Sequence, residues 1–221
     1  MSTTFFAYFS AFSVLFLFAE QLYHRLGITA EHTRKLVHVG AGLLALSFPS
    51  FFDSVEEVLH LCFAFMVILF LSRQHGLLRS IEGIDRHSIG SIAFPLSVML
   101  CYSAYGIFDD PRMYYIPMSI LTISDPLAAY VGRSHPLLVF QFLEGKSLGG
   151  SLAFFTSAWM ISLVILYSFG SPLTYDTVSD AIVIAAMTTM AEMLGLDGLD
   201  NLTIGFFGSF TLAFLFEHIQ L

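Results

Sequence analysis

Long apolar stretches separated by short polar breaks dominate the pattern of this chain. A helix needs about 20 mostly apolar residues to cross a bilayer core. The stretches that approach this length cover residues 4–22, 36–52, 55–72, 88–108, 113–131, 148–170, 179–196 and 201–218. The second and the eighth are short, and Pro49 and Pro95 lie within the second and the fourth. The pattern therefore predicts an all-α, polytopic integral membrane protein with about eight transmembrane helices, organised as a single domain over residues 1–221.

Composition supports the membrane assignment. The chain is 56% hydrophobic and only 12% charged, whereas soluble domains carry about 25% charged residues. No polar break is long enough for a soluble domain, and Cys62 and Cys101 both lie in apolar stretches, where we expect them to pack. The first stretch has no basic residue before it and ends in Glu20-Gln21 instead of small residues. We therefore expect an uncleaved membrane helix there rather than a signal peptide.

The basic residues predict an orientation, because short basic loops stay on the cytoplasmic side of a membrane. With the breaks between stretches numbered along the chain, only Arg112 falls in an even-numbered break. The others occupy the first, third and fifth breaks: Arg25, Arg34, Lys35, Arg73, Arg79, Arg86, Arg133 and Lys146. These breaks should face the cytoplasm, with both termini on the outer side.

Acids and cations also gather toward this predicted cytoplasmic face. Asp125 lies inside an apolar stretch, where insertion of an Asp costs roughly 2.5–3.5 kcal/mol and therefore calls for a partner or a function. The ends of other stretches carry the remaining polar candidates, Arg34, Lys35, Lys146, Ser147, Glu192, Asp200 and Asn201. Carboxylates beside several cations suit Mg²⁺ together with a phosphorylated ligand. Glycines 149 and 150 open the sixth stretch, where a helix N-terminus could offer free N–H groups to an anion.

Each candidate also has a simpler structural explanation. Asp125 could pair with Arg133, two turns further along the same face, and Arg34 and Lys35 could be ordinary interfacial anchors. Glu192 could be satisfied by a neighbouring helix, and Asp200 could cap the last helix. Among the histidines, only His38, one turn after Arg34, is a candidate for the site.

Several blocks of the chain, in order, resemble one known family. The blocks are Arg34-Lys35-Leu36-Val37-His38-Val39-Gly40, the run from Ile123 to Arg133, Gly145-Lys146-Ser147 through Phe155, and Glu192 with Asp200-Asn201-Leu202-Thr203. They are similar to the CTP-dependent polyprenol and lipid kinases, which include dolichol kinase, phytol kinase and CTP-dependent diacylglycerol kinase. The family is distantly related to phosphatidate cytidylyltransferase. The likeness runs from about residue 31 to 205.

The resemblance implies transfer of the γ-phosphate of CTP to the hydroxyl of a membrane lipid alcohol, with Mg²⁺ as cofactor. The implied catalytic residues are Asp125, Lys146 and Glu192, and the implied metal ligands are Asp125, Glu192 and Asp200. The implied nucleotide contacts are Arg34, Lys35, Arg133, Ser147, Gly149, Gly150 and Asn201. The partners are then CTP, the lipid alcohol and the bilayer, without nucleic acid, and an oligomer is compatible with the sequence.

Two departures and two rival functions accompany this resemblance. Many of these kinases have Gly-Asp where this chain has Ser124-Asp125, and the run 134–137 lacks the expected glycine and basic residues. The first rival is a cytidylyltransferase that joins CMP to a phospholipid. Against it, the chain lacks that enzyme's late Pro-Gly-His-Gly-Gly segment. The second rival is a small ion-coupled transporter.

Overall fold

A computed structural model describes residues 1–84, 88–143 and 145–216 of the chain. Arg86, one of the predicted basic-loop residues, lies outside this part. Almost all regular structure is helical, which confirms the all-α prediction. The helices are α1 (Thr3–Leu26), α2 (Ala30–Leu46), α3 (Phe48–Phe51), α4 (Val55–His75), α5 (Arg79–Glu82), α6 (Gly90–Phe108), α7 (Arg112–Ser119), α8 (Asp125–Ser134), α9 (Leu148–Ser168), α10 (Tyr175–Leu194) and α11 (Asp200–Leu215).

Five described helices, α1, α4, α6, α9 and α10, are long and apolar enough to cross a membrane. The chain is therefore a multi-pass membrane protein, but the predicted count of about eight is not reproduced. The other three predicted spans are helical at the expected places. However, α2 has 17 residues and α11 has 16, while the helix of 112–134 is divided by the π-helical turn Ile120–Ser124. These three begin with, or contain, the polar residues of the predicted site, which shortens their apolar length.

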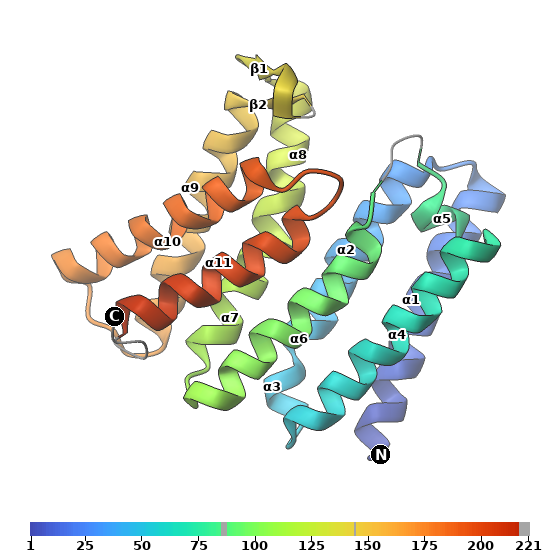
Figure 1. The fold of residues 1–221 in the computed structure, drawn as a ribbon, viewed down its shortest axis with the longest axis horizontal. Helices are drawn as coiled ribbons and strands as arrows, with labels where there is room; N and C mark the ends of the chain where they lie inside the picture. The colour runs from blue at the N-terminus through green and yellow to red at the C-terminus, as the bar shows by residue number, and fades with distance from the viewer. Residues whose placement is uncertain (85–87, 144, 217–221) are drawn as a thin grey trace.

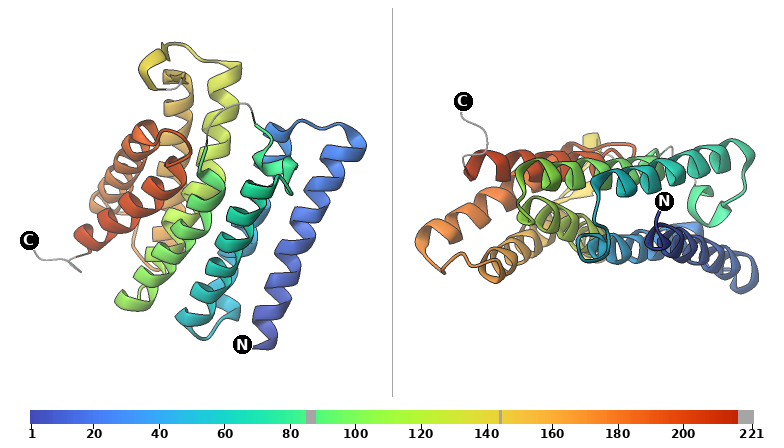
Figure 2. Two further views of the ribbon diagram at one scale, coloured as in Figure 1. Left: turned by 45° about the vertical axis from the view of Figure 1, so that its right-hand side comes forward. Right: turned by 90° about the horizontal axis from the view of Figure 1, so that it is seen from below.

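The helices form two layers. Seen from below, α4, α6 and α11 lie in one layer, and α1, α2, α7–α8 and α9 lie in the other (Figure 2). Helix α10 packs against both α9 and α11 and closes one side. Large aromatic side chains fill the space between the layers, among them the fully buried Phe48, Tyr102 and Tyr114. Because these side chains fill the middle of the bundle, the polar residues of the predicted site lie at the helix ends.

Successive long helices run in opposite directions, so alternate connections share one end of the bundle (Figure 1). The connections α1–α2, α4–α6, α8–α9 and α10–α11 lie at the upper end in that view, and the N-terminus lies at the lower end. Arg112 lies at the lower end, where it pairs with Asp110 at 2.7 Å. The described basic residues of the predicted odd breaks thus gather at one end, as the sequence pattern indicated.

Local sequence signals set several helix ends. Ser54 caps α4 through a hydrogen bond from the backbone N–H of Glu57, and Gly76 ends the helix in the left-handed region. Its φ of 63° is a backbone conformation that favours glycine, because glycine has no Cβ. Between α8 and α9 a short antiparallel pair, β1 (Val139–Phe140) and β2 (Lys146–Ser147), brackets the 3₁₀ turn Gln141–Leu143. This hairpin places Lys146 directly before α9.

Candidate active site

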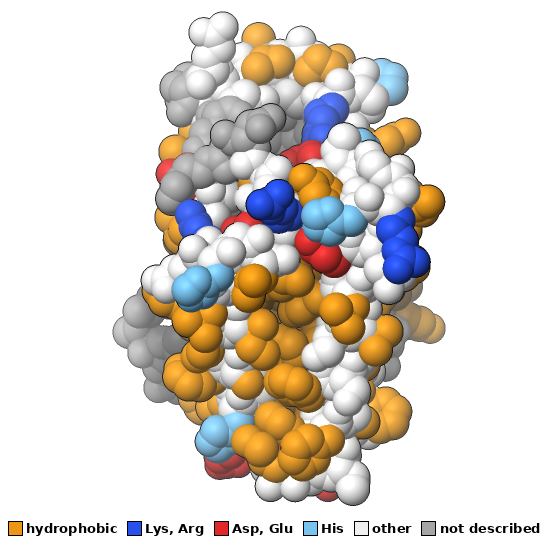
Figure 3. All heavy atoms as spheres, turned by 90° about the vertical axis from the view of Figure 1, so that its right-hand side faces the viewer, with side chains coloured by type: hydrophobic (Ala, Val, Ile, Leu, Met, Phe, Trp, Pro, Cys, Tyr) orange, Lys and Arg blue, Asp and Glu red, His pale blue; other side chains and the backbone are white. Residues whose placement is uncertain are grey.

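A cavity of about 390 Å³ opens at the end of the bundle where these connections meet. We call it the polar cavity. All but one of the residues predicted for the site line it: Arg34, Lys35, Asp125, Arg133, Lys146, Ser147, Gly150, Glu192, Asp200 and Asn201. On the face where α1 and α4 lie, charged and histidine side chains gather toward the same end above a largely hydrophobic lower part (Figure 3). The structure thus brings together residues from most of the length of the chain, from Arg34 on α2 to Asn201 on α11.

Lys146 lies between two carboxylates. Its Nζ atom is 2.8 Å from Oε1 of Glu192 and 3.6 Å from Oδ2 of Asp200, and it also donates to the backbone carbonyl of Glu192. The Lys146 and Glu192 side chains are only 15% and 10% exposed. Desolvated charges need such close partners, because an isolated buried ion is very costly. Lys146 therefore fixes the start of α9 against the end of α10 and the start of α11.

Asp125 follows the π-helical turn directly, and π turns are frequent at functional sites. Pro126 has no N–H to donate to a carbonyl of the preceding turn. In that turn, the carbonyl of Leu121 accepts a hydrogen bond from Nε2 of His38 at 2.9 Å. The same Nε2 atom lies 3.8 Å from Oδ2 of Asp125. Because a carbonyl only accepts, Nε2 of His38 must carry the proton. His38 thus joins α2 to the turn that presents Asp125.

Arg133 pairs with Glu31, not with Asp125. Its Nη2 atom lies 2.7 Å from Oε1 of Glu31, and the Arg133 side chain is 53% exposed. The simpler explanation in which Asp125 pairs with Arg133 is therefore wrong. Glu31 lies at the start of α2 and Arg133 at the end of α8, and both side chains line the polar cavity. The Asp125 carboxylate stays available to the cavity interior.

The opposite wall of the cavity joins α2 to α6 and α11. Nη2 of Arg34 donates to the hydroxyl of Ser88 at 2.7 Å, and Nδ2 of Asn201 donates to the carbonyl of Gly90 at 2.8 Å. A Cβ atom on Gly90 would lie 2.5 Å from Nη2 of Arg34. The small residue at the start of α6 therefore makes room for the guanidinium group.

The start of α9 differs from the sequence-based expectation. The N–H groups of Leu148 and Gly149 donate to the carbonyls of Leu138 and Pro136. The N–H group of Gly150 donates to the hydroxyl of Ser147 at 3.2 Å. These groups are therefore not offered to an anion. Gly149 does not line the cavity, because it packs so tightly that an added Cβ would lie 2.0 Å from the carbonyl oxygen of His135.

Small residues instead bring α8 and α9 together, as their spacing predicted. A Cβ atom on Gly150 would lie 2.9 Å from the carbonyl oxygen of Ala128 and 3.3 Å from Cα of Gly132. A Cβ on Gly132 would lie 2.9 Å from Oγ of Ser147. This close approach places the Asp125 helix beside the Lys146 helix.

Curated relatives match most of this chain. A phytol kinase of Synechocystis sp. is 31% identical over 194 residues, which cover 83% of this chain and 79% of that protein. The chain belongs to the phytol kinase family. Phytol kinase 1, chloroplastic, of Arabidopsis thaliana is 26% identical over 85% of this chain and 67% of its own length. A probable phytol kinase 2, chloroplastic, of Glycine max is 25% identical, and the chain spans 54% of its length. No family model and no solved structure matches the chain.

The donor atoms of this phytol kinase family member suit Mg²⁺ only together with a phosphorylated ligand. Within the described residues, no three His, Cys, Asp or Glu side chains form a ready-made metal site. Mg²⁺ usually takes one or two carboxylates and completes its shell with phosphate oxygens and water. Asp125 and Asp200 both line the cavity and can supply such carboxylates; Lys146 lies closer to Glu192, at 2.8 Å, than to Asp200, at 3.6 Å. The residues thus fit a metal that arrives with its phosphates.

Three polar residues that line the cavity of this family member were not among the site candidates from the sequence: Glu31, Ser88 and Ser151. Glu31 was detectable as the acid beside the basic block that opens α2. Ser151 lies one helical turn after Ser147, and its buried hydroxyl has no hydrogen-bond partner within the described part of the chain. A buried hydroxyl without a partner is costly, so a ligand in the cavity would satisfy it.

Proposed function

We propose that this chain is a lipid-alcohol kinase that transfers the γ-phosphate of CTP to the hydroxyl of a membrane isoprenoid alcohol, with phytol as the first candidate. One arrangement carries the proposal. The Lys146 ammonium, held by Glu192 and Asp200, shares one cavity with Asp125 at the end of an apolar bundle. Membership of the phytol kinase family supports the choice of reaction, and phytol is the alcohol after which the relatives are named.

Phosphoryl transfer needs positioning and neutralisation of oxygen charge more than it needs covalent help from the protein. In the proposed reaction, Lys146 and Arg34 hold the phosphate oxygens inside the cavity, and Arg133 holds them at its mouth. Mg²⁺, when bound with the nucleotide, would further neutralise the phosphates. The acceptor oxygen bonds to the γ-phosphorus while the bond from this phosphorus to the β–γ bridging oxygen breaks, so that CDP leaves.

The acceptor hydroxyl must lose its proton during this transfer. Asp125 is the proposed acceptor of the proton, because its carboxylate lies in the cavity beside His38 and is not paired with Arg133. General-base assistance of this kind contributes about 10²–10⁴ in rate. Glu192 is the less suitable base, since its carboxylate is paired with Lys146.

We also propose an orientation. The polar cavity lies at the end where the described basic connections gather, and the positive-inside rule puts such connections in the cytoplasm. In this arrangement α2, α11 and the divided helix of residues 112–134 also cross the membrane, packed among the longer helices, and both termini lie outside. Labelling of single introduced cysteines at positions 77 and 174 with a membrane-impermeant reagent tests this topology.

The activity test uses purified full-length protein with Mg²⁺, phytol and CTP labelled either at the γ- or at the α-phosphorus. We expect the lipid to gain label from γ-labelled CTP only, with CDP as the second product. Label from the α-phosphorus in the lipid, with release of pyrophosphate, would show CMP transfer and overturn the proposal. Parallel reactions with ATP, diacylglycerol and a long polyprenol identify the donor and the acceptor.

A further inference from the structure

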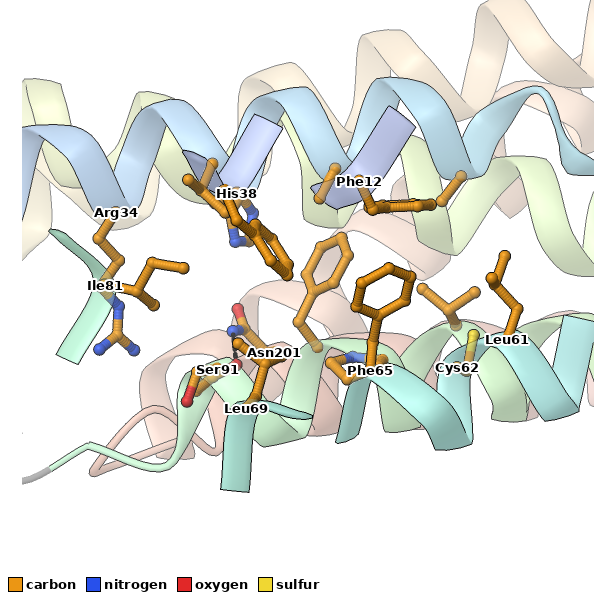
Figure 4. A pocket seen from close by; sticks show the side chains of 18 of the residues that line it. Phe12, Arg34, His38, Leu61, Cys62, Phe65, Leu69, Ile81, Ser91 and Asn201 are labelled. Carbon is orange, nitrogen blue, oxygen red and sulfur yellow. Dashed lines mark hydrogen bonds between the residues drawn. The ribbon is translucent and has the colours of Figure 1, made fainter. Parts of the chain in front are cut away.

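A second, apolar pocket of about 80 Å³ lies between the two layers and adjoins the polar cavity. We call it the apolar pocket. Its walls come mainly from α1, α2, α4 and α6, and they include Phe12, Ala41, Ala45, Phe65 and Val98. Figure 4 shows Arg34, His38 and Asn201 toward one end and Leu61 and Cys62 toward the other. The first three residues line both the apolar pocket and the polar cavity, so the two spaces meet there.

We propose that the apolar pocket binds the part of the acceptor's hydrocarbon chain nearest its hydroxyl, a step that rests on the proposed kinase function. The hydroxyl then lies where the apolar pocket meets the polar cavity, close to His38 and on the side of the pocket that faces Asp125. Arg34, His38, Ala41 and Ala45 follow one another on one face of α2. At 1.5 Å per residue, the pocket extends about 10 Å along α2 from His38 to Ala45.

The size of the pocket matches part of a single chain. A cavity needs about 10–15 Å³ to hold one water molecule. The apolar pocket, at about 80 Å³, therefore admits several methyl-sized groups in a row. Ala41 and Ala45 leave this space because their side chains end at Cβ. The remainder of a longer chain must therefore leave the pocket for the lipid.

In this proposal, the hydrocarbon chain of the alcohol enters the apolar pocket between α1 and α4. The Phe65 ring of α4 contacts Phe12 and Phe16 of α1, with ring centroids 5.2 and 5.5 Å apart. The face of the molecule on which α1 and α4 lie is largely hydrophobic in its lower part (Figure 3). Phenylalanine side chains make no hydrogen bonds that would resist their movement. These three rings thus separate the pocket from lipid and can admit an apolar chain.

The lining also favours one class of alcohol. Away from Arg34, His38, Asn201 and the hydroxyl of Ser91, the pocket offers mainly hydrocarbon. A diacylglycerol would bring two ester-linked acyl chains next to its hydroxyl, whereas a pocket of about 80 Å³ matches part of a single chain. A single-chain isoprenoid alcohol has only hydrocarbon beyond its hydroxyl. The apolar pocket therefore selects single-chain isoprenoid alcohols over diacylglycerol.

The first experiment narrows the pocket. Ala45→Phe fills its deep end, and Ala41→Leu is a milder variant that keeps the test usable if the larger one does not fold. Leu43→Phe adds similar bulk on the same helix, but at a side chain that is 58% exposed toward lipid. A misfit of a single methylene in a hydrophobic pocket changes kcat/KM by roughly 10–200-fold, so we expect phytol kcat/KM to fall at least tenfold in the pocket variants while the KM for CTP is unchanged. Equal effects of Ala45→Phe and Leu43→Phe would overturn the proposal.

The second experiment does not depend on catalysis. Wild-type protein is irradiated with a C20 isoprenoid alcohol that carries a diazirine near its hydroxyl, and the labelled peptides are identified. Labelling of α1, α2 or α4 that excess phytol prevents supports the site, even if no phosphate is transferred and the kinase proposal fails. Labelling confined to α9 and α10 overturns the site, even if the wild-type protein phosphorylates phytol.

Discussion

The Nζ atom of Lys146 lies 2.8 Å from Oε1 of Glu192, and this contact joins helices that start and end at the polar cavity. Both side chains are largely buried, so each charge depends on the other. Removing one partner of a buried pair leaves an uncompensated charge, whereas replacing both partners often costs little. The pair therefore offers a way to separate a structural contribution of Lys146 from a catalytic one.

Lys146→Met should lower the free energy of unfolding by about 3–5 kcal/mol, because the Glu192 carboxylate loses its counter-charge. Lys146→Met combined with Glu192→Gln should regain most of that stability. Both proteins should transfer phosphate about 10²–10³ times more slowly than wild type, because the cation that neutralises phosphate oxygens is absent from each. Thermal unfolding and single-turnover assays measure the two effects. Recovery of activity in the stable double variant would show that Lys146 only holds the fold.

Asp125→Asn should reduce kcat by about 10²–10⁴ if the carboxylate accepts the hydroxyl proton. The amide keeps the shape of the side chain, so the thermal stability should change little. Asp180→Asn is the matched control, because Asp180 lies on α10 outside the residues that line the polar cavity. Radiolabelled phytol phosphate is the readout. Near-normal turnover by purified Asp125→Asn would remove the proposed base.

Glu31→Gln should lower the KM for CTP, because Glu31 pairs with Arg133 and in the proposed site would compete with phosphate for it. Arg133→Gln should raise the same KM. The pair is partly exposed, so either change should alter the free energy of unfolding by no more than about 1 kcal/mol. Steady-state kinetics at two salt concentrations test this, since screening weakens exposed charges. An unchanged KM in both variants would place Arg133 outside the nucleotide site.

Gly42→Ala should destabilise the protein by about 1–3 kcal/mol through overpacking. A Cβ at this position would lie 2.3 Å from Oγ1 of Thr122, inside the π-helical turn before Asp125. Gly40→Ala on the same helix is the control, since its Cβ would meet only the flexible end of Leu15 at 3.0 Å. Thermal unfolding of both variants in one detergent compares them. Equal stability would mean that α2 and the turn can separate without cost.

The sequence predicted which residues would meet because helix direction alternates along a chain of membrane spans. Asp125 and Lys146 stand out as charges within or beside apolar stretches, and alternation puts them at one end. The partners of individual charges were not predictable. Whether Arg133 meets Asp125 or Glu31 depends on the distance between α2 and α8, which the pattern of either helix does not contain.

Two other features depend on packing in the same way. The donors at the start of α9 are used by the loop before it, and that loop has no strong pattern of its own. The apolar pocket exists because Ala41 and Ala45 face Phe65 across two layers. Alanines on an apolar helix are equally compatible with tight packing, so the sequence alone does not show a space there.

The position of α11 late in the chain has a consequence for how the protein is made. Asp200 and Asn201 stand at the start of α11, and both belong to the polar cavity. A nascent chain that has inserted every earlier helix still lacks one acid beside Lys146 and the amide that secures Gly90. If the proposed function holds, catalytic competence arrives late in biosynthesis, after translation has passed α11, and chains that end before α11 should not consume nucleotide.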